Sequence, residues 1–208
     1  MRVLVAGGTG LVGKAALIAA AKQNIHTIAV GRRPSGHGTE EIVADFDALP
    51  SLPQADVALC ALGTTIKRAG SKAAFKAVDY SAVMAFAAAA QQSGVNHFIV
   101  VTAVGSNPDS SVFYSSVKGA VERDLDAMGF GRLDIVQPGL LLGPRTEKRP
   151  VEEFLQTVSP VMDIFMRGPW KRYGSVKAEE LGEVLITLTH QQTPGVFRHT
   201  KADWTHRH

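Results

Sequence analysis

A glycine-rich turn near the amino terminus constrains the fold of this chain more than any other feature. Val3–Ala6 is a short apolar run that predicts a buried strand, and Lys14–Lys22 is rich in alanine and predicts a helix. A strand that turns into a helix through glycines exposes the first N–H groups of the helix and its positive dipole end, which together bind a phosphate. The alternative, that the glycines only make a tight turn, accounts less well for their spacing and flanks. The glycines are Gly7, Gly8, Gly10 and Gly13.

We predict that this turn holds the phosphates of a dinucleotide. Glycine is needed because a side chain would block both the approach of the phosphate and the contact between helix and strand. The residues predicted to bind the cofactor at the turn are Gly7, Thr9, Gly10, Leu11, Val12 and Gly13.

The composition is that of a soluble globular domain. The 208 residues are 45% hydrophobic, and we expect one domain over 1-208. No apolar run approaches the roughly 20 residues of a membrane span, so no membrane partner is expected. The net charge of +3 does not imply nucleic-acid binding. Cys60 is the single cysteine and no export signal is recognised, so we expect a cytoplasmic protein without an intrachain disulfide.

Strand and helix signals alternate along the chain. This pattern predicts an α/β fold, a Rossmann-type doubly wound parallel sheet with helices on both faces. Ligands bind such folds at the carboxyl ends of the strands, so the segments that follow strands are the candidates for a site. The predicted strands are Val3–Ala6, Thr27–Val30, Glu41–Ala44, Val57–Leu62, His97–Thr102 and Arg132–Gln137. The predicted helices are Gly10–Gln23, Ser71–Ser93, Val112–Met128 and Lys177–His190.

The pattern loosens after Pro138. Proline and glycine punctuate Gly143–Gly174, where we predict a small substrate lobe over about 143-176 with a short helix near Glu152–Val158. The polar tail His199–His208 is expected to be frayed. It holds three of the seven histidines but no ligand set on firm structure, so no metal site is predicted.

The end of the second predicted strand indicates which dinucleotide is bound. Many NAD sites place a carboxylate there to hold the adenosine ribose. Here Arg32 and Arg33 take its place, and a guanidinium matches and neutralises the extra 2′-phosphate of NADP. We therefore predict NADP(H) as the cofactor, the alternative being two solvated loop arginines. Asp45 and Phe46, just after the third strand, are predicted to contact the adenine.

Tyr114 and Lys118 are a candidate proton-transfer pair. Their spacing of four, at the start of the helix after the fifth predicted strand, puts both on one helical face. A phenol titrates at about pH 10, and a neighbouring ammonium is expected to lower its pKa. Thr102, at the end of the fifth strand, is expected to orient the substrate carbonyl. Tyr173 and Lys177 share the spacing but not the position, so they are assigned no chemistry; the alternative for Tyr114 and Lys118 is a core tyrosine and a surface lysine.

Further motifs narrow the prediction. Besides the glycine turn and Tyr114-x-x-x-Lys118-Gly119, they are Leu62-Gly-Thr-Thr65, Lys67, Ala69-Gly70, Phe75, Val78-Asp79 and Pro138-Gly-Leu-Leu-Leu-Gly143. This set resembles the short-chain dehydrogenase/reductase superfamily in its extended or atypical form. Within it, the chain is similar to the Tat-interacting tumour-suppressor family, an NADPH-binding, oxidoreductase-like group. The resemblance covers nearly the whole chain.

The resemblance implies roles for more residues. It makes Tyr114 and Lys118 the proton-transfer pair, with Lys118 also bonded to the nicotinamide ribose. The serine usual at the end of the fifth strand is absent, which leaves Thr102, or as a second choice Ser106, to supply that hydroxyl. The residues that it places along the cofactor are Leu62, Gly63 and Thr64, and at the nicotinamide end Pro138, Gly139, Leu140 and Leu141.

Three functions follow as hypotheses. The favoured one is an NADPH-dependent carbonyl reductase of a small-molecule substrate, in which Tyr114 protonates the carbonyl oxygen. A second is a regulatory or redox-sensing module that binds NADPH without turnover and acts on a protein partner; the small lobe and the substituted serine favour it. A third is a nucleotide-sugar epimerase or dehydratase, against which the arginine pair argues. The oligomeric state stays open: the protein is either a monomer or a homodimer formed through the predicted helices Ser71–Ser93 and Val112–Met128.

Overall fold

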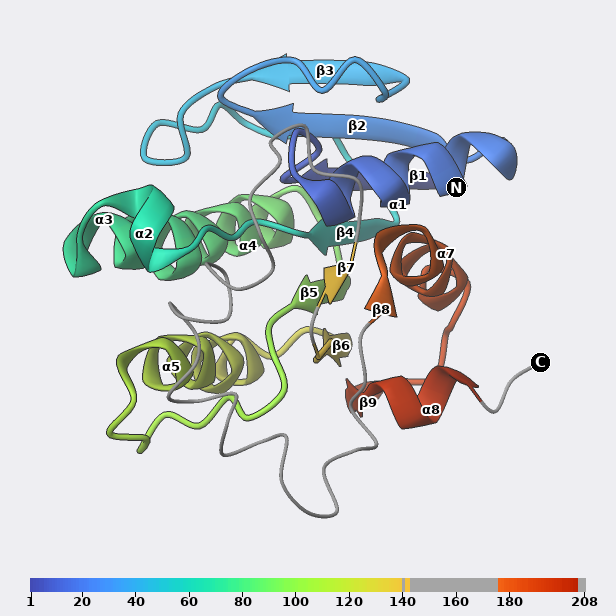
Figure 1. Cartoon of the computed structure of the whole chain (residues 1–208). Helices are drawn as coiled ribbons and strands as arrows, with labels where there is room; N and C mark the ends of the chain where they lie inside the picture. Colours follow the sequence, from blue (N-terminus) through green and yellow to red (C-terminus); the bar gives the residue numbers. More distant parts are fainter. Residues whose placement is uncertain (140, 143–175, 206–208) are drawn as a thin grey trace.

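A parallel sheet of seven strands forms the centre of the molecule (Figure 1). The structure, a computed structural model, describes residues 1–139, 141–142 and 176–205. The strand order is β3-β2-β1-β4-β5-β6-β9, and all six neighbouring pairs are parallel. The predicted α/β doubly wound sheet is therefore confirmed. The strands are β1 (Arg2–Ala6), β2 (His26–Gly31), β3 (Glu40–Val43), β4 (Val57–Cys60), β5 (His97–Val101), β6 (Arg132–Val136) and β9 (Gly195–His199).

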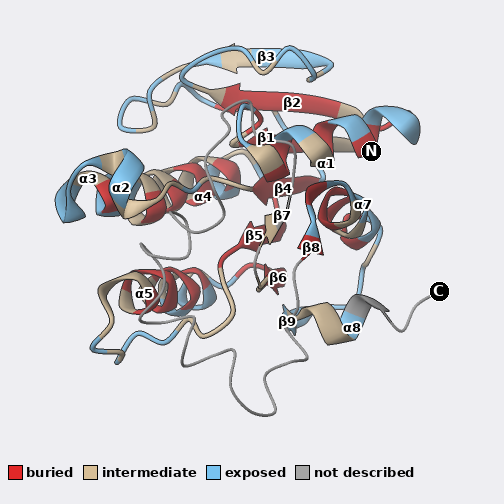
Figure 2. Cartoon of the chain, viewed as in Figure 1, coloured by how far each residue is buried: buried red, intermediate tan, exposed pale blue. Residues whose placement is uncertain are grey.

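Helices cover both faces of the sheet, and each face has its own apolar core (Figure 2). On β1, Val3 and Val5 face α1 and α7, whereas Leu4 and Ala6 face α4 and α5. This alternation is the period of two that a strand buried on both faces must satisfy. The helices that flank the sheet are α1 (Leu11–Lys22), α4 (Ala82–Gln92), α5 (Phe113–Ala127) and α7 (Ala178–Leu188). The short elements are α2 (Ile66–Ala69), α8 (Lys201–Thr205), and the paired β7 (Leu141–Leu142) and β8 (Val176–Lys177).

One continuous helical segment lies across the sheet ahead of β5. It combines α3 (Lys72–Lys76), a π-helical turn η1 (Ala77–Ser81) and α4, which confirms the helix predicted over Ser71–Ser93. Among the described residues this segment alone has the length and composition to cross a membrane, a property that the sequence analysis overlooked. Phe75 and Phe86, however, are fully buried in the fold.

The carboxyl-terminal strand corrects the predicted frayed tail. His199 ends β9, which pairs with β6, and α8 follows it. Because β9 is the edge strand and is largely exposed, it lacks the apolar run by which a buried strand is recognised. The lobe predicted over 143–176 falls outside the described residues except for Val176. The helix predicted near Glu152–Val158 and the tyrosine at 173 also lie outside them.

A buried carboxylate joins the last three strands of the sheet. Asp134 of β6 is fully buried, and it accepts hydrogen bonds from Arg132 Nε at 2.6 Å and from His97 Nε2 and His199 Nε2, both at 2.7 Å. Burial alone would raise the pKa of Asp134, but the bonds from His199, His97 and Arg132 outweigh burial and hold the pKa well below its usual range. The exposed strand β9 is thus anchored to the sheet through a polar contact as well as its ladder.

Asp134→Asn is expected to lower the free energy of unfolding by about 3 kcal/mol, because it leaves the buried Arg132 guanidinium without its charged partner. Urea unfolding at neutral pH measures the change. Asp126→Asn, which alters an exposed carboxylate on α5, is the control and should stay within about 0.5 kcal/mol of wild type. Because the folded pKa of Asp134 lies below the unfolded value of about 3.9, its contribution is present above that pH and is lost as the pH falls further. Equal stabilities of Asp134→Asn and wild type at pH 7 contradict this role.

Candidate functional site

The glycine turn between β1 and α1 can be made only by glycine at two positions. Gly7 has a φ of +88°, and a Cβ there would lie 2.6 Å from the carbonyl carbon and oxygen of Ala61, which follows β4. A Cβ on Gly13 would overlap the carbonyl of Gly7. Both contacts are with backbone, which cannot swing away as a flexible side chain can. The turn therefore packs too tightly against the end of β4 and against α1 to admit a Cβ at either position.

The amino terminus of α1 is open to an anion. Gly10 is the N-cap, no side chain caps it, and the first turn holds no acidic residue. Thr9 and Gly10 are exposed. The first N–H groups of a 12-residue helix therefore point outward with the positive end of its dipole. The side chain of Val12, by contrast, is packed in the core, so only its backbone can contribute to binding.

A small pocket beside this turn gathers most of the residues predicted for the adenosine end. Arg32 and Arg33 follow β2 and are exposed, whereas Asp45, also exposed, is not among the lining residues. The sequence analysis missed Glu41, whose carboxylate accepts hydrogen bonds from the Ser35 hydroxyl at 2.5 Å and the Gly36 N–H at 3.0 Å. Glu41 thereby shapes the loop after the arginines. The lining residues are Gly7, Gly8, Thr9, Ala29, Val30, Gly31, Arg32, Arg33, Ser35, Glu41, Phe46 and Leu62.

Tyr114 and Lys118 lie in the first turns of α5, as predicted. Lys118 is only 4% exposed, and its Nζ lies 2.8 Å from Oδ1 of Asp79, which is 1% exposed. The other oxygen of Asp79 accepts a hydrogen bond from the Thr64 N–H at 2.8 Å. A Cβ on the exposed Gly63 would lie 3.4 Å from Asp79 Oδ1, so the loop after β4 rests directly on the ion pair. The structure thus brings the predicted residues Gly63 and Thr64 to Lys118 through a carboxylate that was given no role.

Asp79 changes the electrostatics expected for Tyr114. Burial raises the pKa of Tyr114; the Lys118 ammonium lowers it, but the Asp79 carboxylate raises it again, so the pKa lies above its usual value. The expected lowering of this pKa is therefore wrong. Burial by itself would lower the pKa of Lys118, but the adjacent Asp79 keeps it raised and the ammonium charged. Burial raises the pKa of the Asp79 carboxyl. Lys118 and the Thr64 N–H oppose this effect, because both stabilise the ionised carboxylate.

The hydroxyl of Thr102 is already engaged. It is buried at the end of β5 and donates to Oε1 of Glu122 on α5 at 2.6 Å, and Gln137 Nε2 donates to the same oxygen at 2.9 Å. Thr102 would have to break this bond to orient a carbonyl, so that role stays a prediction. Ser106, the second choice, donates to the carbonyl of Ala103 at 2.7 Å.

The segment after β6 lies next to the loop after β5. The carbonyl of Pro138 accepts a hydrogen bond from the Val104 N–H at 3.2 Å, and Leu141 packs against the core on the α1 side. Leu140, also predicted to bind the cofactor, lies outside the described residues. The carboxyl ends of β1, β4, β5 and β6 therefore meet at one edge of the sheet, where the predicted site residues gather.

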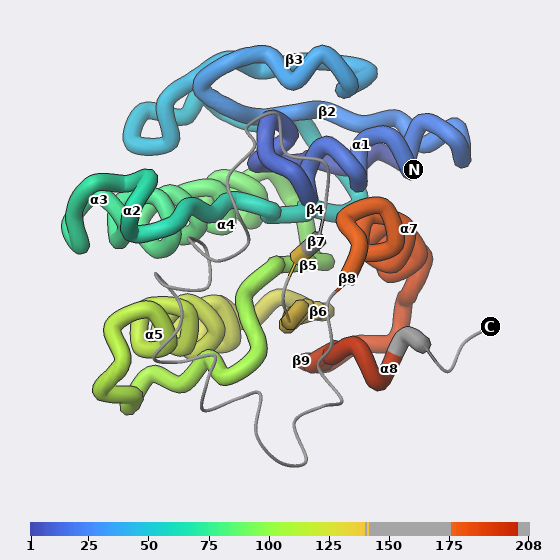
Figure 3. Tube along the Cα trace, viewed as in Figure 1, coloured from blue at the N-terminus to red at the C-terminus, as the bar shows by residue number. Residues whose placement is uncertain are grey.

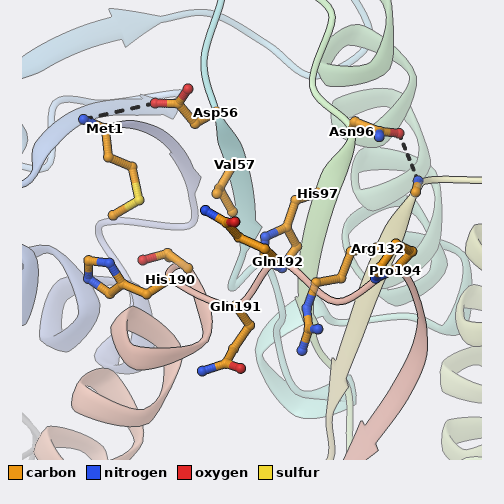
Figure 4. Close-up of a pocket in the computed structure, with 12 residues that line it drawn as sticks. Met1, Asp56, Val57, Asn96, His97, Arg132, His190, Gln191, Gln192 and Pro194 are labelled. Atoms are coloured by element: carbon orange, nitrogen blue, oxygen red, sulfur yellow. Dashed lines mark hydrogen bonds and ion pairs between the residues drawn. The ribbon is translucent and has the colours of Figure 1, made fainter.

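A larger pocket, of about 600 Å³, lies at the opposite edge, where the strands begin (Figure 4). His97 and Arg132 line it, but both are already hydrogen-bonded to Asp134. None of the predicted site residues that the structure describes lines this pocket. Nor do the described residues contain a group of three or more His, Cys, Asp or Glu placed to hold a metal ion.

Comparison with known proteins identifies the family. The family model described as HIM1 matches residues 32–167. This chain belongs to that family. Among curated relatives, the mitochondrial protein FMP52-2 of Scheffersomyces stipitis is 31% identical over 201 residues, 90% of this chain and 86% of that protein. HTATIP2 of Rattus norvegicus is 34% identical over 162 residues, 72% of this chain and 66% of that protein. The resemblance to the Tat-interacting group of atypical short-chain dehydrogenases is confirmed.

Solved structures share the fold. A putative NAD-dependent epimerase/dehydratase from Bacillus halodurans matches all of both chains with a TM-score of 0.72 and 19% identity. Human epimerase family protein SDR39U1 with NADPH matches 96% of this chain and 74% of its own with a TM-score of 0.66 and 19% identity. MoeE5 in complex with UDP-glucose and NAD matches 95% of this chain and 75% of its own, with a TM-score of 0.71 and 17% identity.

The names of the yeast relatives contradict the expected cytoplasmic location. FMP52-2 of Scheffersomyces stipitis and the FMP52 proteins of Debaryomyces hansenii and Candida albicans are all named as mitochondrial. The expectation was wrong because it rested on the single cysteine and on the lack of a recognised export signal. Neither property distinguishes the cytosol from the interior of an organelle.

Gly13→Ala is expected to lower the free energy of unfolding by about 2 kcal/mol, because its Cβ forces the Gly7 carbonyl out of place. Gly31→Ala is the matched control, since its Cβ meets only the Arg33 carbonyl, at an ordinary 3.5 Å. Thermal unfolding of the two variants measures the difference. Equal melting temperatures of the two variants would contradict the close contact between position 13 and the Gly7 carbonyl.

Proposed function

We propose that this protein is an NADPH-dependent oxidoreductase that reduces a carbonyl group of a small-molecule substrate. The observation that carries the proposal is the placement of Lys118, one helical turn after Tyr114, beside the exposed Gly63 loop at the same sheet edge as the glycine turn. Solved structures of the same fold whose titles name NAD or NADPH support a nicotinamide cofactor.

The residues present fit such a cofactor. The uncapped amino terminus of α1 suits the phosphates, and the glycines leave space that a Cβ would fill. Arg32 and Arg33 are exposed at the pocket beside the turn, where a guanidinium fork would hold a 2′-phosphate and favour NADPH over NADH. Phe46 and Leu62 offer apolar surface in the same pocket for the adenine.

The chemistry divides between cofactor and protein. NADPH, when bound, supplies the hydride to the carbonyl carbon. Tyr114 donates its phenolic proton to the carbonyl oxygen, a role for which its raised pKa keeps it protonated at neutral pH. Lys118, charged and buried beside the Gly63 loop, would orient the ribose of the cofactor.

The engaged Thr102 hydroxyl favours a second candidate function. With its proton donated to Glu122, the Thr102 hydroxyl is not already free to orient a carbonyl. An NADPH-binding regulatory or redox-sensing module, which acts on a protein partner without turnover, needs no such group. Partner capture that depends on NADPH, together with no turnover, would favour this alternative.

Tyr114→Phe is expected to lower kcat/KM for NADPH-dependent carbonyl reduction by about 10²- to 10⁴-fold, the usual contribution of a general acid. NADPH affinity should stay unchanged, because the phenol acts on the substrate. Nicotinamide absorbance follows turnover against a panel of aldehydes, ketones and quinones, and nicotinamide fluorescence follows binding. Tyr80→Phe is the matched control, since the Tyr80 hydroxyl donates to Asp124 on the outer side of α5. Turnover that persists in Tyr114→Phe contradicts the assignment.

Replacing both Arg32 and Arg33 by alanine is expected to weaken NADPH binding about tenfold or more and to leave NADH binding unchanged. The loss corresponds to about 1.5 kcal/mol or more for hydrogen bonds to a charged group. Isothermal titration with each nucleotide measures the two dissociation constants. Arg123→Ala, which removes an exposed arginine of α5, controls for net charge. Parallel loss of NADPH and NADH affinity would show that the pair does not read the 2′-phosphate.

A further inference from the structure

Two helical segments run side by side at the candidate site (Figure 3). The ring of Phe75 on α3 lies 5.7 Å from the ring of Tyr114 on α5. One turn further along both segments, Asp79 on η1 meets Lys118 on α5 at 2.8 Å. Both helical segments advance by four residues between these two contacts. Tyr114 therefore lies opposite an aromatic ring, and Lys118 lies opposite a carboxylate.

Asp79 and Lys118 form an ion pair in the interior of the protein. Both groups are almost fully buried, and Asp79 also accepts the Thr64 N–H, so its two oxygens have different partners. Asp79 lies in a π-helical turn, an irregularity that is frequent at functional sites. The exposed Gly63 covers the pair, which places it next to whatever occupies the sheet edge.

Two titratable groups act on Tyr114 among the described residues: Lys118 from its own helix and Asp79 from η1. A third group, Cys60 of β4, interacts with Lys118 and Asp79. Burial raises the pKa of the Cys60 thiol to about 12, so this group is neutral at physiological pH. The charge near the phenol is therefore that of the Lys118 ammonium and the Asp79 carboxylate alone.

We propose that Asp79 is a positioning residue that holds Lys118 and offsets its charge, so that Tyr114 stays protonated and serves as an acid. The inference rests on the proposed reductase function and deepens it, because it sets the pH range over which Tyr114 can donate a proton to the substrate. An uncompensated ammonium beside a phenol stabilises the phenolate, which accepts a proton and suits alcohol oxidation. A neutral Lys118–Asp79 pair leaves the phenol as a donor, which suits carbonyl reduction.

Titration of the tyrosines tests this inference without any turnover. The chain has three tyrosines, and the component lost in Tyr114→Phe identifies Tyr114 in the ultraviolet absorbance of the tyrosinate. Asp79→Asn, nearly the same size, should lower the midpoint of Tyr114 by about 1 to 3 pH units. Circular dichroism over the same range confirms that each protein stays folded; where wild type unfolds first, its unfolding pH is the lower limit for its midpoint.

Lys118 variants distinguish an electrostatic effect of Asp79→Asn from a purely structural one. Lys118→Met should have the highest Tyr114 midpoint of the set, and the double variant Asp79→Asn/Lys118→Met should return toward wild type, because it removes both charges. Asp124→Asn is the matched control, since Asp124 accepts the Tyr80 hydroxyl and should shift only the Tyr80 component. An unchanged Tyr114 midpoint in Asp79→Asn, or a lowered one in the double variant, overturns the proposal.

Kinetics then separate this inference from the proposed function. In Asp79→Asn, the alkaline limb of the pH profile for carbonyl reduction should move to lower pH with the Tyr114 midpoint. A limb that stays in place while the midpoint moves overturns the claim that Asp79 sets the pH range in which Tyr114 acts as an acid. If wild type reduces no carbonyl, the reductase proposal fails, and the titration alone still decides whether Asp79 controls Tyr114.

Discussion

The ion pair between Asp79 and Lys118 joins three segments of the candidate site. It joins the helix that follows the α2 loop to the helix that carries Tyr114, and through the Thr64 N–H it joins both to the loop after β4. A buried pair of this kind is costly to break, because either partner alone would be an uncompensated charge in the interior. The position of Lys118 and the support of the Gly63 loop therefore depend on one contact.

The buried sheet could be read from the sequence because its inner strands are largely apolar and helices follow β1, β4 and β5. The β9 strand could not, since it is an exposed edge whose attachment depends on Asp134, a residue distant in sequence. The π-helical turn was equally hidden: the pattern over Ser71–Ser93 predicts a helix but not the irregular turn that holds Asp79.

The site was predictable to the extent that it depends on local chemistry. The glycine turn and the Tyr114–Lys118 spacing follow from neighbours along the chain, and the structure brings them to one sheet edge. The direction of the Tyr114 pKa shift does not, because it depends first on burial and then on Asp79 of another helix. Likewise, Thr102 has the right position for a catalytic hydroxyl, yet its proton goes to Glu122, which only the packing of α5 on β5 reveals.

The family assignment does not decide which reaction, if any, the protein catalyses. The chain shares its family with FMP52 and HTATIP2, and it shares its fold with proteins whose titles name NAD or NADPH. What separates a reductase from a module that only binds the nucleotide is whether hydride leaves it. Transfer of deuterium from NADPH that carries deuterium at both C4 positions of the nicotinamide to a carbonyl panel, read by mass spectrometry, measures this directly. A reductase gives an alcohol product that carries one deuterium; NADPH that binds, as fluorescence shows, but keeps both labels with every carbonyl contradicts the proposed function.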